Sequence, residues 1–332
     1  MGTSTHFSGN ATNRELAGWP RSNHGNPIQV DLPCENPSME RLLRAWGKVT
    51  PPEKITQEAW DRDAGHLRRL VRLRPGQRAD AADLWAYTQD LLFTEIQGPL
   101  LVYVLPFCMD AWCEDLRGIN SGFGGFVEYF YQVLADRGIF EKILTPKQNA
   151  AISDFMRQTI LEEIDDQRGL FYKGMTARPY RWFGALTTYG VLRPDIDHLF
   201  SSWWSLDTVG RAVAAVQYIA CLMYPENENP VFARWTREGG GGPPGLWEFE
   251  GHLYRHRWLQ SNVDFLRGHL TVRSVSDLLG RAGDRLADQE EHDAAAGIRD
   301  DLPLCVETLE SRCAELPRLL EMVQTELFEW SR

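Results

Sequence analysis

The sequence predicts an all-α protein: a multi-helix bundle with an extended N-terminal arm and a C-terminal helical hairpin. Apolar residues recur three and four positions apart through much of the chain, as they do on the buried face of an amphipathic helix. Residues that start and stop helices, such as Thr145-Pro146 and Gly138, bound several of these apolar stripes. We expect an arm over residues 1–37, a helical scaffold over 38–170, a Trp- and Arg-rich helical region over 171–270 and the hairpin over 271–332.

The composition is that of a globular protein. Hydrophobic residues make up 43% and charged residues 24% of the 332 positions, close to the averages of soluble domains. The sequence has no apolar run of bilayer-spanning length and no signal-peptide pattern, and its six cysteines form no CxxC pair. We therefore expect a cytoplasmic protein without a membrane partner.

The charge balance is acidic. Lys and Arg total 35 against 46 Asp and Glu, which gives a formal net charge of −11. This charge repels a phosphate backbone unless a basic patch overrides it. The densest basic patch, His66 to Arg74, is typical of a solvated helix face. Nucleic acid is therefore a disfavoured partner, whereas a basic protein is a favoured one.

The first elements follow from prolines, glycines and apolar spacing. Several prolines and no periodicity before residue 38 indicate an extended arm. A first helix is expected over Met39–Trp46, with Gly47 as its C-terminal cap. A second helix is expected after Pro51-Pro52, carrying Trp60, Leu67 and Leu70 on its apolar side.

The next stretch predicts consecutive packed helices. Leu84, Thr88 and Leu91 share one helical face behind the capping candidate Asp80. The apolar run over 100–105 suits a buried strand by composition. Pro106 and the helical spacing that follows it favour a kinked helix instead. A glycine-rich loop over 118–125 then precedes another apolar stripe, which ends at Gly138.

The clearest helix start is a capping box. Thr145 precedes Pro146, and Gln148 lies three positions after the threonine. The apolar stripe that follows ends in four carboxylates between Glu162 and Asp166. Clustered carboxylates raise one another's pKa and can perform acid–base chemistry. The favoured interpretation is a helix end that is solvated or held by a cation such as Arg168.

Regular helical spacing returns toward the C-terminus. Apolar residues over 209–220 predict a buried helix. Two further stripes, over 272–286 and 302–330, are joined by a polar link over 290–300 and predict the hairpin. Pro317 disfavours a long straight zipper, so pairing within the chain is favoured over dimerisation.

One trio of residues predicts a metal site. Glu248, His252 and His256 are spaced four apart, which places them on roughly one face of a helix. Imidazole and carboxylate suit zinc, iron or manganese, and a metal with an open position activates water, with Asp195 as a candidate base. The competing interpretation makes both histidines hydrogen-bonded core residues, because their spacing continues into apolar positions from Leu259 onward. The favoured prediction has no cofactor, and a divalent metal is its alternative.

Half of the twelve tryptophans lie between residues 171 and 270, interleaved with arginines. Aromatic faces and guanidinium groups can stack on ligands, which makes this region the expected contact surface. Its candidate residues are Trp203, Trp204, Trp247 and Arg181. No nucleophile-elbow or phosphate-loop motif is present, so no catalytic residue is assigned. We expect an accessory or immunity-type protein that binds a protein partner; the alternative is a metal-dependent enzyme with its site in a helical bundle.

Overall fold

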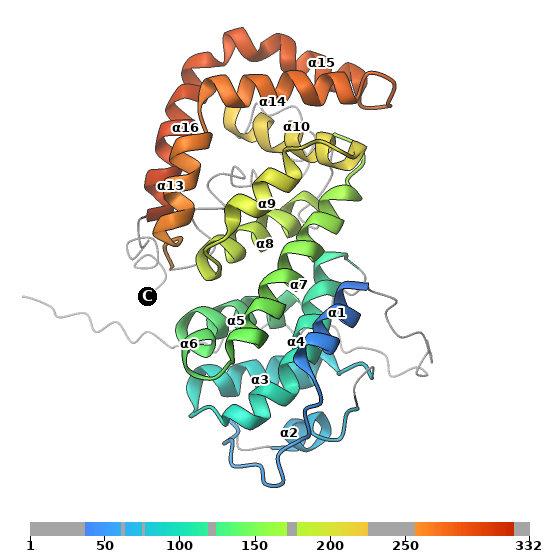
Figure 1. The fold of residues 1–332 in the computed structure, drawn as a ribbon, viewed down its shortest axis with the longest axis vertical. Coiled ribbons are helices and arrows are strands. Elements are labelled where there is room, and N and C mark those ends of the chain that lie inside the picture. Colours follow the sequence, from blue (N-terminus) through green and yellow to red (C-terminus); the bar gives the residue numbers. More distant parts are fainter. Residues whose placement is uncertain are drawn as a thin grey trace, which may run out of the picture. The chain divides into compact units, whose positions relative to one another are not determined.

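The computed structural model describes residues 37–60, 64–74, 77–118, 124–170, 178–224 and 256–321, without the side chains of 124, 125, 128 and 178–180. Within these ranges the chain forms fourteen α-helices, one 3-10 helix and no strand (Figure 1), which confirms the all-α prediction. None of the described helices combines the length and the apolar character needed to cross a membrane. The predicted arm lies outside the described residues except for its last residue, Pro37, which begins the first helix.

The first part of the chain forms seven helices. They are α1 (Pro37–Trp46), α2 (Gly65–Leu70), α3 (Ala81–Phe93), α4 (Gly98–Leu116), α5 (Gly124–Asp136), α6 (Ile139–Lys142) and α7 (Pro146–Asp165). Gly47 follows α1 at a φ of +82°, a left-handed conformation that glycine adopts without steric cost. The helix predicted over Met39–Trp46 is therefore present and begins two residues earlier.

The second predicted helix is wrong over most of its length. Residues 51–60 are not helical, and only the six residues of α2 are. The backbone N–H groups of Thr56 and Gln57 are bonded to the side chain of Gln97, which lies just before α4. Contacts with α3 and α4 thus replace the hydrogen bonds that a local helix would have made.

Helices α3 and α4 follow their predicted signals. Asp80 caps α3, because its carboxylate accepts a hydrogen bond from the backbone N–H of Ala82 at 2.8 Å. The run over 100–105 is helical, and Pro106 lies inside the 19-residue α4. Most residues of α4 are buried, which explains why its sequence lacks the polar face of a surface helix.

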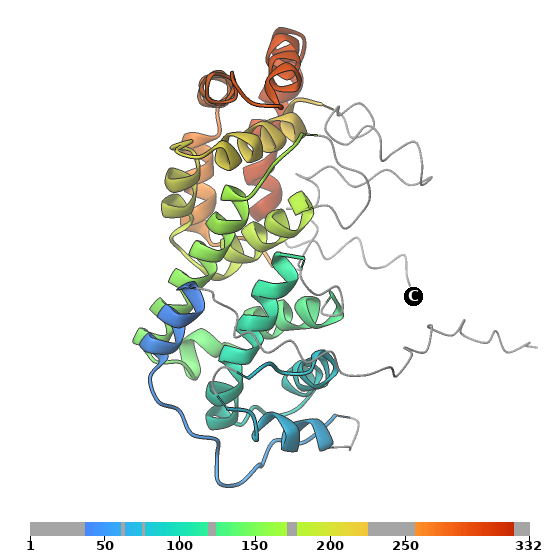
Figure 2. The same cartoon turned by 90° about the vertical axis from the view of Figure 1, so that its right-hand side faces the viewer.

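Helix α7 connects the two parts of the chain. Thr145 and Gln148 form the predicted capping box. The helix contacts α1, which precedes it in the sequence, and α8, α9 and α10, which follow it (Figures 1 and 2). Its acidic end is held by a cation, which is one of the two predicted alternatives, but the cation that binds Asp165 is Arg211. Arg211 binds the Asp165 carboxylate through two nitrogens, at 2.8 and 3.2 Å, while the Arg168 guanidinium donates to backbone carbonyls.

The second part of the chain is also helical. Its elements are α8 (Arg178–Leu192), α9 (Ile196–Trp203), α10 (Val209–Met223), α13 (Gln260–His269), α14 (Val272–Arg285), α15 (His292–Asp301), the 3-10 helix η3 (Leu302–Leu304) and α16 (Val306–Glu321). Nearly every residue of α10 is buried, in agreement with the prediction, since α7, α14 and α16 all pack on it. Gly210 permits the contact with α7: a Cβ there would lie 2.0 Å from the backbone oxygen of Asp165.

The C-terminal stripes form helices, but their link differs from the expectation. The segment expected to be a polar link over 290–300 forms α15, which folds back along α14 (Figure 1). Helix α16 packs most extensively on α13 and contacts α14 less. Pro317 lies within α16, and the chain beyond Glu321 falls outside the described residues.

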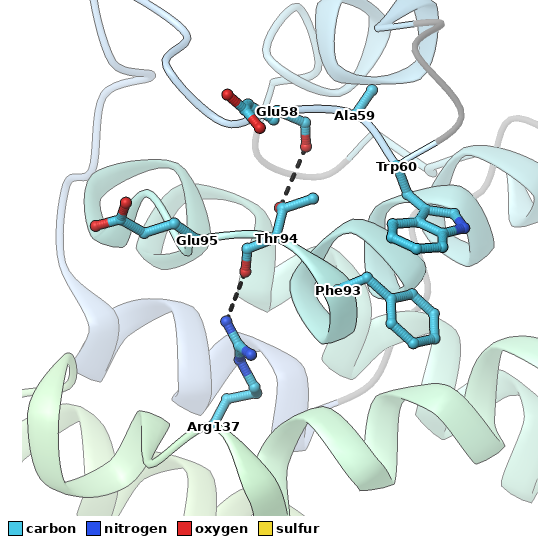
Figure 3. A pocket seen from close by; sticks show the side chains of 7 residues that line it. All are labelled: Glu58, Ala59, Trp60, Phe93, Thr94, Glu95 and Arg137. Atoms are coloured by element: carbon cyan, nitrogen blue, oxygen red, sulfur yellow. Dashed lines mark hydrogen bonds between the residues drawn. The ribbon is translucent and has the colours of Figure 1, made fainter.

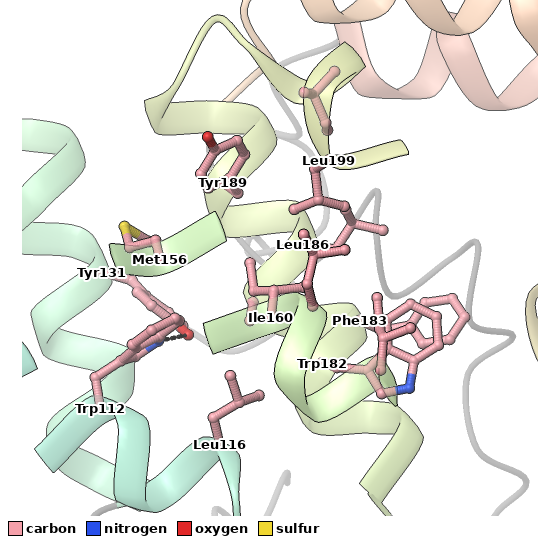
Figure 4. Packing of buried hydrophobic residues seen from close by; sticks show 14 of the residues in the cluster. Trp112, Leu116, Tyr131, Met156, Ile160, Trp182, Phe183, Leu186, Tyr189 and Leu199 are labelled. Carbon is pink, nitrogen blue, oxygen red and sulfur yellow. Dashed lines mark hydrogen bonds between the residues drawn. The ribbon is translucent and has the colours of Figure 1, made fainter. Parts of the chain in front are cut away.

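The core runs through both parts of the chain. Figure 4 shows Trp112 of α4, Tyr131 of α5, Ile160 of α7, Leu186 of α8 and Leu199 of α9 among the buried residues of this core. The indole N–H of Trp112 donates to the hydroxyl of Tyr131 at 2.5 Å, which satisfies a polar atom that the core would otherwise isolate. Large side chains from five helices therefore meet in one continuous apolar interior.

Candidate binding surface

The predicted contact tryptophans belong to the core. Trp203 has an exposed fraction of 0%, and its ring lies 5.2 Å from that of Trp182 and 5.4 Å from that of Tyr218, centroid to centroid. Trp204 is half-buried and packs on Phe200. Neither ring offers a large exposed face, since both pack within the aromatic cluster of α8, α9 and α10. Trp247 lies outside the described residues.

Arg181 has a structural environment. Its guanidinium lies against Gly118, where a Cβ would come within 1.7 Å of Nη1. Burial raises the pKa of the nearby Asp115 carboxyl, and the positive charge of Arg181 partly offsets that effect. A cation just beyond the end of α4 also favours the negative end of the helix dipole. Arg181 thus stabilises the junction of α4 and α8.

The predicted metal site lies mostly outside the described residues. Glu248 and His252 belong to that part of the chain, while His256 is described and pairs with Asp136 of α5 at 3.0 Å. Among the described residues, no three His, Cys, Asp or Glu side chains converge as metal ligands. The metal site stays a prediction, which metal analysis of the purified protein and of His252→Ala would test.

Exposed aromatic residues gather in a different place, around α3. Trp60, Trp85 and Phe93 are 57%, 41% and 53% exposed, and within the described ranges only Leu304 and Val306 are other large apolar side chains of this kind. We define the aromatic surface as Trp60, Trp85, Phe93 and Tyr129. Large exposed apolar groups that cluster in this way commonly mark an interaction site.

The aromatic surface consists of two ring pairs. The rings of Trp60 and Phe93 lie 4.6 Å apart, and those of Trp85 and Tyr129 lie 6.2 Å apart, measured between centroids. Trp85 and Phe93 are eight residues apart on α3, which places them within about 80° of each other and roughly 12 Å apart along its axis. The two pairs therefore share one side of α3, while Leu84 and Leu91 occupy its buried side.

Trp60 is held in place although its ring is exposed. Its backbone N–H donates to the Asp90 carboxylate at 2.7 Å, and the other oxygen of that carboxylate lies 2.5 Å from Nε2 of His66. Asp90 and His66 are almost fully buried, with exposed fractions of 1% and 4%. A buried hydrogen-bonded pair thus fixes the backbone that carries the indole.

A second set of hydrogen bonds fixes residues 54–57 of the same loop. Gln97 accepts from the N–H of Thr56 at 2.8 Å and of Gln57 at 3.1 Å, and its own N–H donates to the side chain of Gln57 at 2.8 Å. The Gln97 amide also donates to the carbonyl of Lys54 at 2.7 Å. We call this reciprocal arrangement the glutamine clamp. It fastens residues 54–57 to the start of α4.

An open pocket of about 700 Å³ adjoins the Trp60–Phe93 pair. Figure 3 shows the two rings on one side and the exposed carboxylates of Glu58 and Glu95 on the other. Arg137 also lines the pocket, but its guanidinium donates to the carbonyls of Leu92 and Thr94 at the end of α3. Because Arg137 is hydrogen-bonded to these carbonyls, it does not pair with Glu58 or Glu95 in the described structure. The two carboxylates can therefore bind a cationic group from outside the chain.

A buried carboxyl group outside the aromatic surface, on α4, also has a shifted pKa. Burial and the neighbouring Glu114 raise the pKa of Asp110 on α4 to about 6, although Arg78 and Arg117 act in the opposite direction. Its Oδ1 is enclosed and accepts no hydrogen bond from a described residue. A carboxyl with a raised pKa is a common feature of functional sites, although burial within a helical core raises a pKa in the same way.

Comparison with protein-family models, with curated proteins and with solved structures finds no match to this chain. The aromatic surface is thus defined by geometry alone. A signal for it is present in the sequence, since Trp85 and Phe93 lie away from the Leu84–Leu91 stripe on a helix whose buried face is already complete. An aromatic residue on the polar side of an amphipathic helix is the pattern that would have identified it.

Proposed function

We propose that this chain is an accessory or immunity-type protein that binds a basic protein partner through the aromatic surface around α3. The observation that supports the proposal most directly is Trp60, an indole that is 57% exposed on a backbone fixed by buried polar groups. Packing of the core does not require that ring to be there. Such an arrangement is expected of a residue that anchors a partner.

The energetics of interfaces favour this interpretation. Tryptophan and tyrosine are enriched among the residues that carry most of the binding free energy. A side chain held in position before binding loses less conformational entropy when the complex forms. Asp90 and the glutamine clamp supply this order from within the folded chain.

Charge favours a basic partner. Glu58 and Glu95 line the same pocket on the side opposite the rings, and the whole chain carries a formal net charge of −11. Acidic surfaces accelerate encounter with basic proteins and discriminate against acidic ones. A partner that places an apolar group on Trp60 and a lysine or arginine near Glu58 fits both features.

Affinity purification from the native host tests the proposal. We expect one basic protein to be retained by the tagged wild-type chain and lost from the Trp60→Ala/Trp85→Ala double variant. Once that partner is produced separately, Trp60→Ala is expected to raise Kd by at least about tenfold, because truncation of an anchoring aromatic typically costs 2 kcal/mol or more.

The matched control is Leu304→Ala/Val306→Ala, which removes the exposed apolar side chains away from α3. This control should bind as wild type does, and high salt should weaken binding to both. Elution of the wild-type chain alone at every salt concentration would contradict the proposal. So would equal retention of the partner by the double variant.

A further inference from the structure

A second pocket, of about 320 Å³, is lined by none of the residues of the aromatic surface. It forms where the ends of α5 and α8 and the short helix α6 meet the segment that leads into α13. Its apolar walls are Leu134, Ala135, Phe140, Val191, Leu192 and Leu259. A volume near 300 Å³ is at the lower end of small-molecule sites and too small for a folded partner.

The walls are preformed. Leu134 and Phe140 are buried, and the backbone N–H of Leu259 donates to the carbonyl of Gly190, just before Val191, at 3.1 Å. Asn262 ties the same segment to α8, because its side chain donates to the carbonyls of Gly190 and Arg193 at 2.8 and 2.6 Å. A ligand would therefore find the pocket in place.

Two basic side chains line the pocket, and only one of them is paired with a carboxylate in the described structure. His256 lines it, but its Nε2 is 3.0 Å from the Asp136 carboxylate and is thereby engaged. Arg257 also lines it, is exposed and forms no hydrogen bond or ion pair with a described residue. Arg193 adds a second cation near this wall, with its guanidinium carbon 4.9 Å from the centroid of the Phe140 ring.

Only one carboxylate, that of Glu141, lines the pocket in the described structure. It is exposed and forms no ion pair with Arg257 in the described structure. An anionic group can therefore bind Arg257 without displacing an existing ion pair. The apolar walls and the Arg257 guanidinium together define the ligand.

We infer that this pocket binds a small carboxylic acid with an apolar body. The apolar part lies against Phe140, Val191 and Leu192, and the carboxylate accepts hydrogen bonds from Arg257. This inference is independent of the proposed partner, because none of these residues belongs to the aromatic surface.

Isothermal titration calorimetry of the full chain with 1-naphthaleneacetate tests the inference. The acid should bind with a stoichiometry of one, whereas the neutral amide 1-naphthaleneacetamide should bind about tenfold more weakly, as expected for the loss of a charged hydrogen bond. Arg257→Gln should weaken the acid by a similar factor and leave the amide unchanged. Val191→Trp should abolish both by filling the pocket.

Arg273→Gln is the matched control, since it removes an exposed arginine of α14 that does not line the pocket. It should leave both affinities unchanged. Absence of saturable binding at millimolar acid would overturn the inference, as would equal affinities for acid and amide. Unaltered binding of the acid to Arg257→Gln would overturn it too, and this exposed substitution leaves the fold intact.

Discussion

Trp203 and Trp60 are the same residue type in opposite surroundings. Trp203 is fully enclosed by the rings of Trp182, Phe200 and Tyr218, whereas Trp60 is more than half exposed beside Phe93. The described tryptophans of the Trp-rich region, Trp182, Trp203, Trp204 and Trp258, are therefore buried or half-buried, while a sparser aromatic group around α3 forms the surface. Aromatic density along a sequence indicates a core at least as often as a contact site; position on the helix face distinguishes the two.

The largest expected effect is the difference between the two tryptophans in how much their replacement by alanine lowers the free energy of unfolding. Trp203→Ala should lower the free energy of unfolding by about 3 to 5 kcal/mol, because it empties a buried site and removes a hydrogen bond to the carbonyl of Arg211. Trp60→Ala should lower it by less than about 1 kcal/mol, as surface substitutions do. Chemical denaturation of both variants measures the difference. Equal losses would show that Trp60 serves the core.

A smaller change in stability is expected when a glycine packed against a buried indole is replaced by alanine. A Cβ on Gly190 would come within 2.4 Å of the Trp258 indole, so Gly190→Ala should cost roughly 1 to 3 kcal/mol of stability through overpacking. Gly268 of α13 is the matched glycine, since a Cβ there meets nothing within 4 Å. Gly268→Ala should instead stabilise the protein by up to about 1 kcal/mol. A stable Gly190→Ala variant would mean that the indole has room to move.

The third prediction concerns Asp110 of α4, a helix that packs against both α5 and α8. The pKa of Asp110 is raised to about 6 in the folded chain, so folding favours its protonated form. The stability gained from that proton is present below about pH 4 and is lost as the pH rises through 6. Asp110→Asn should therefore raise the free energy of unfolding by about 2 kcal/mol at pH 8 and by little at pH 3.5.

Denaturation curves at pH 8 and pH 3.5 test whether Asp110→Asn raises the free energy of unfolding only at the higher pH. Asp300→Asn replaces an exposed carboxylate of α15 and should change stability little at either pH. A loss of stability for Asp110→Asn at pH 8 would show that the ionised carboxylate is stabilised by Arg78 and Arg117 more than burial disfavours it.

The elements that sequence predicted best are those defined by local chemistry. Thr145, Pro146 and Gln148 set the start of α7, and Gly47 sets the end of α1, through contacts within a few residues. The loop over 51–60 was missed because the glutamine clamp joins residues about 40 positions apart, which periodicity does not record. Likewise α15 buries only Ala295 and Ile298, too few apolar residues to form a recognisable stripe.

The candidate site was harder to predict for a related reason. The sequence placed the contact surface on Trp203 and Arg181, but burial is a property of the packed helices rather than of residue type. Trp60 and Phe93 are 33 positions apart and form a pair only after the loop docks on α3. Of the predicted residues, Glu248, His252 and Trp247 lie outside the described residues, and their roles stay predictions.

The glutamine clamp also has a consequence for the order of folding. Closing a loop of about 40 residues is entropically unfavourable until α3 and α4 already lie together, so we expect the clamp to form late. Trp60 reaches its place only at that stage, because Asp90 and Gln97 must first be positioned by their helices. A chain in which the clamp has not formed therefore lacks the Trp60–Phe93 pair, and the proposed partner would select molecules whose loop has docked.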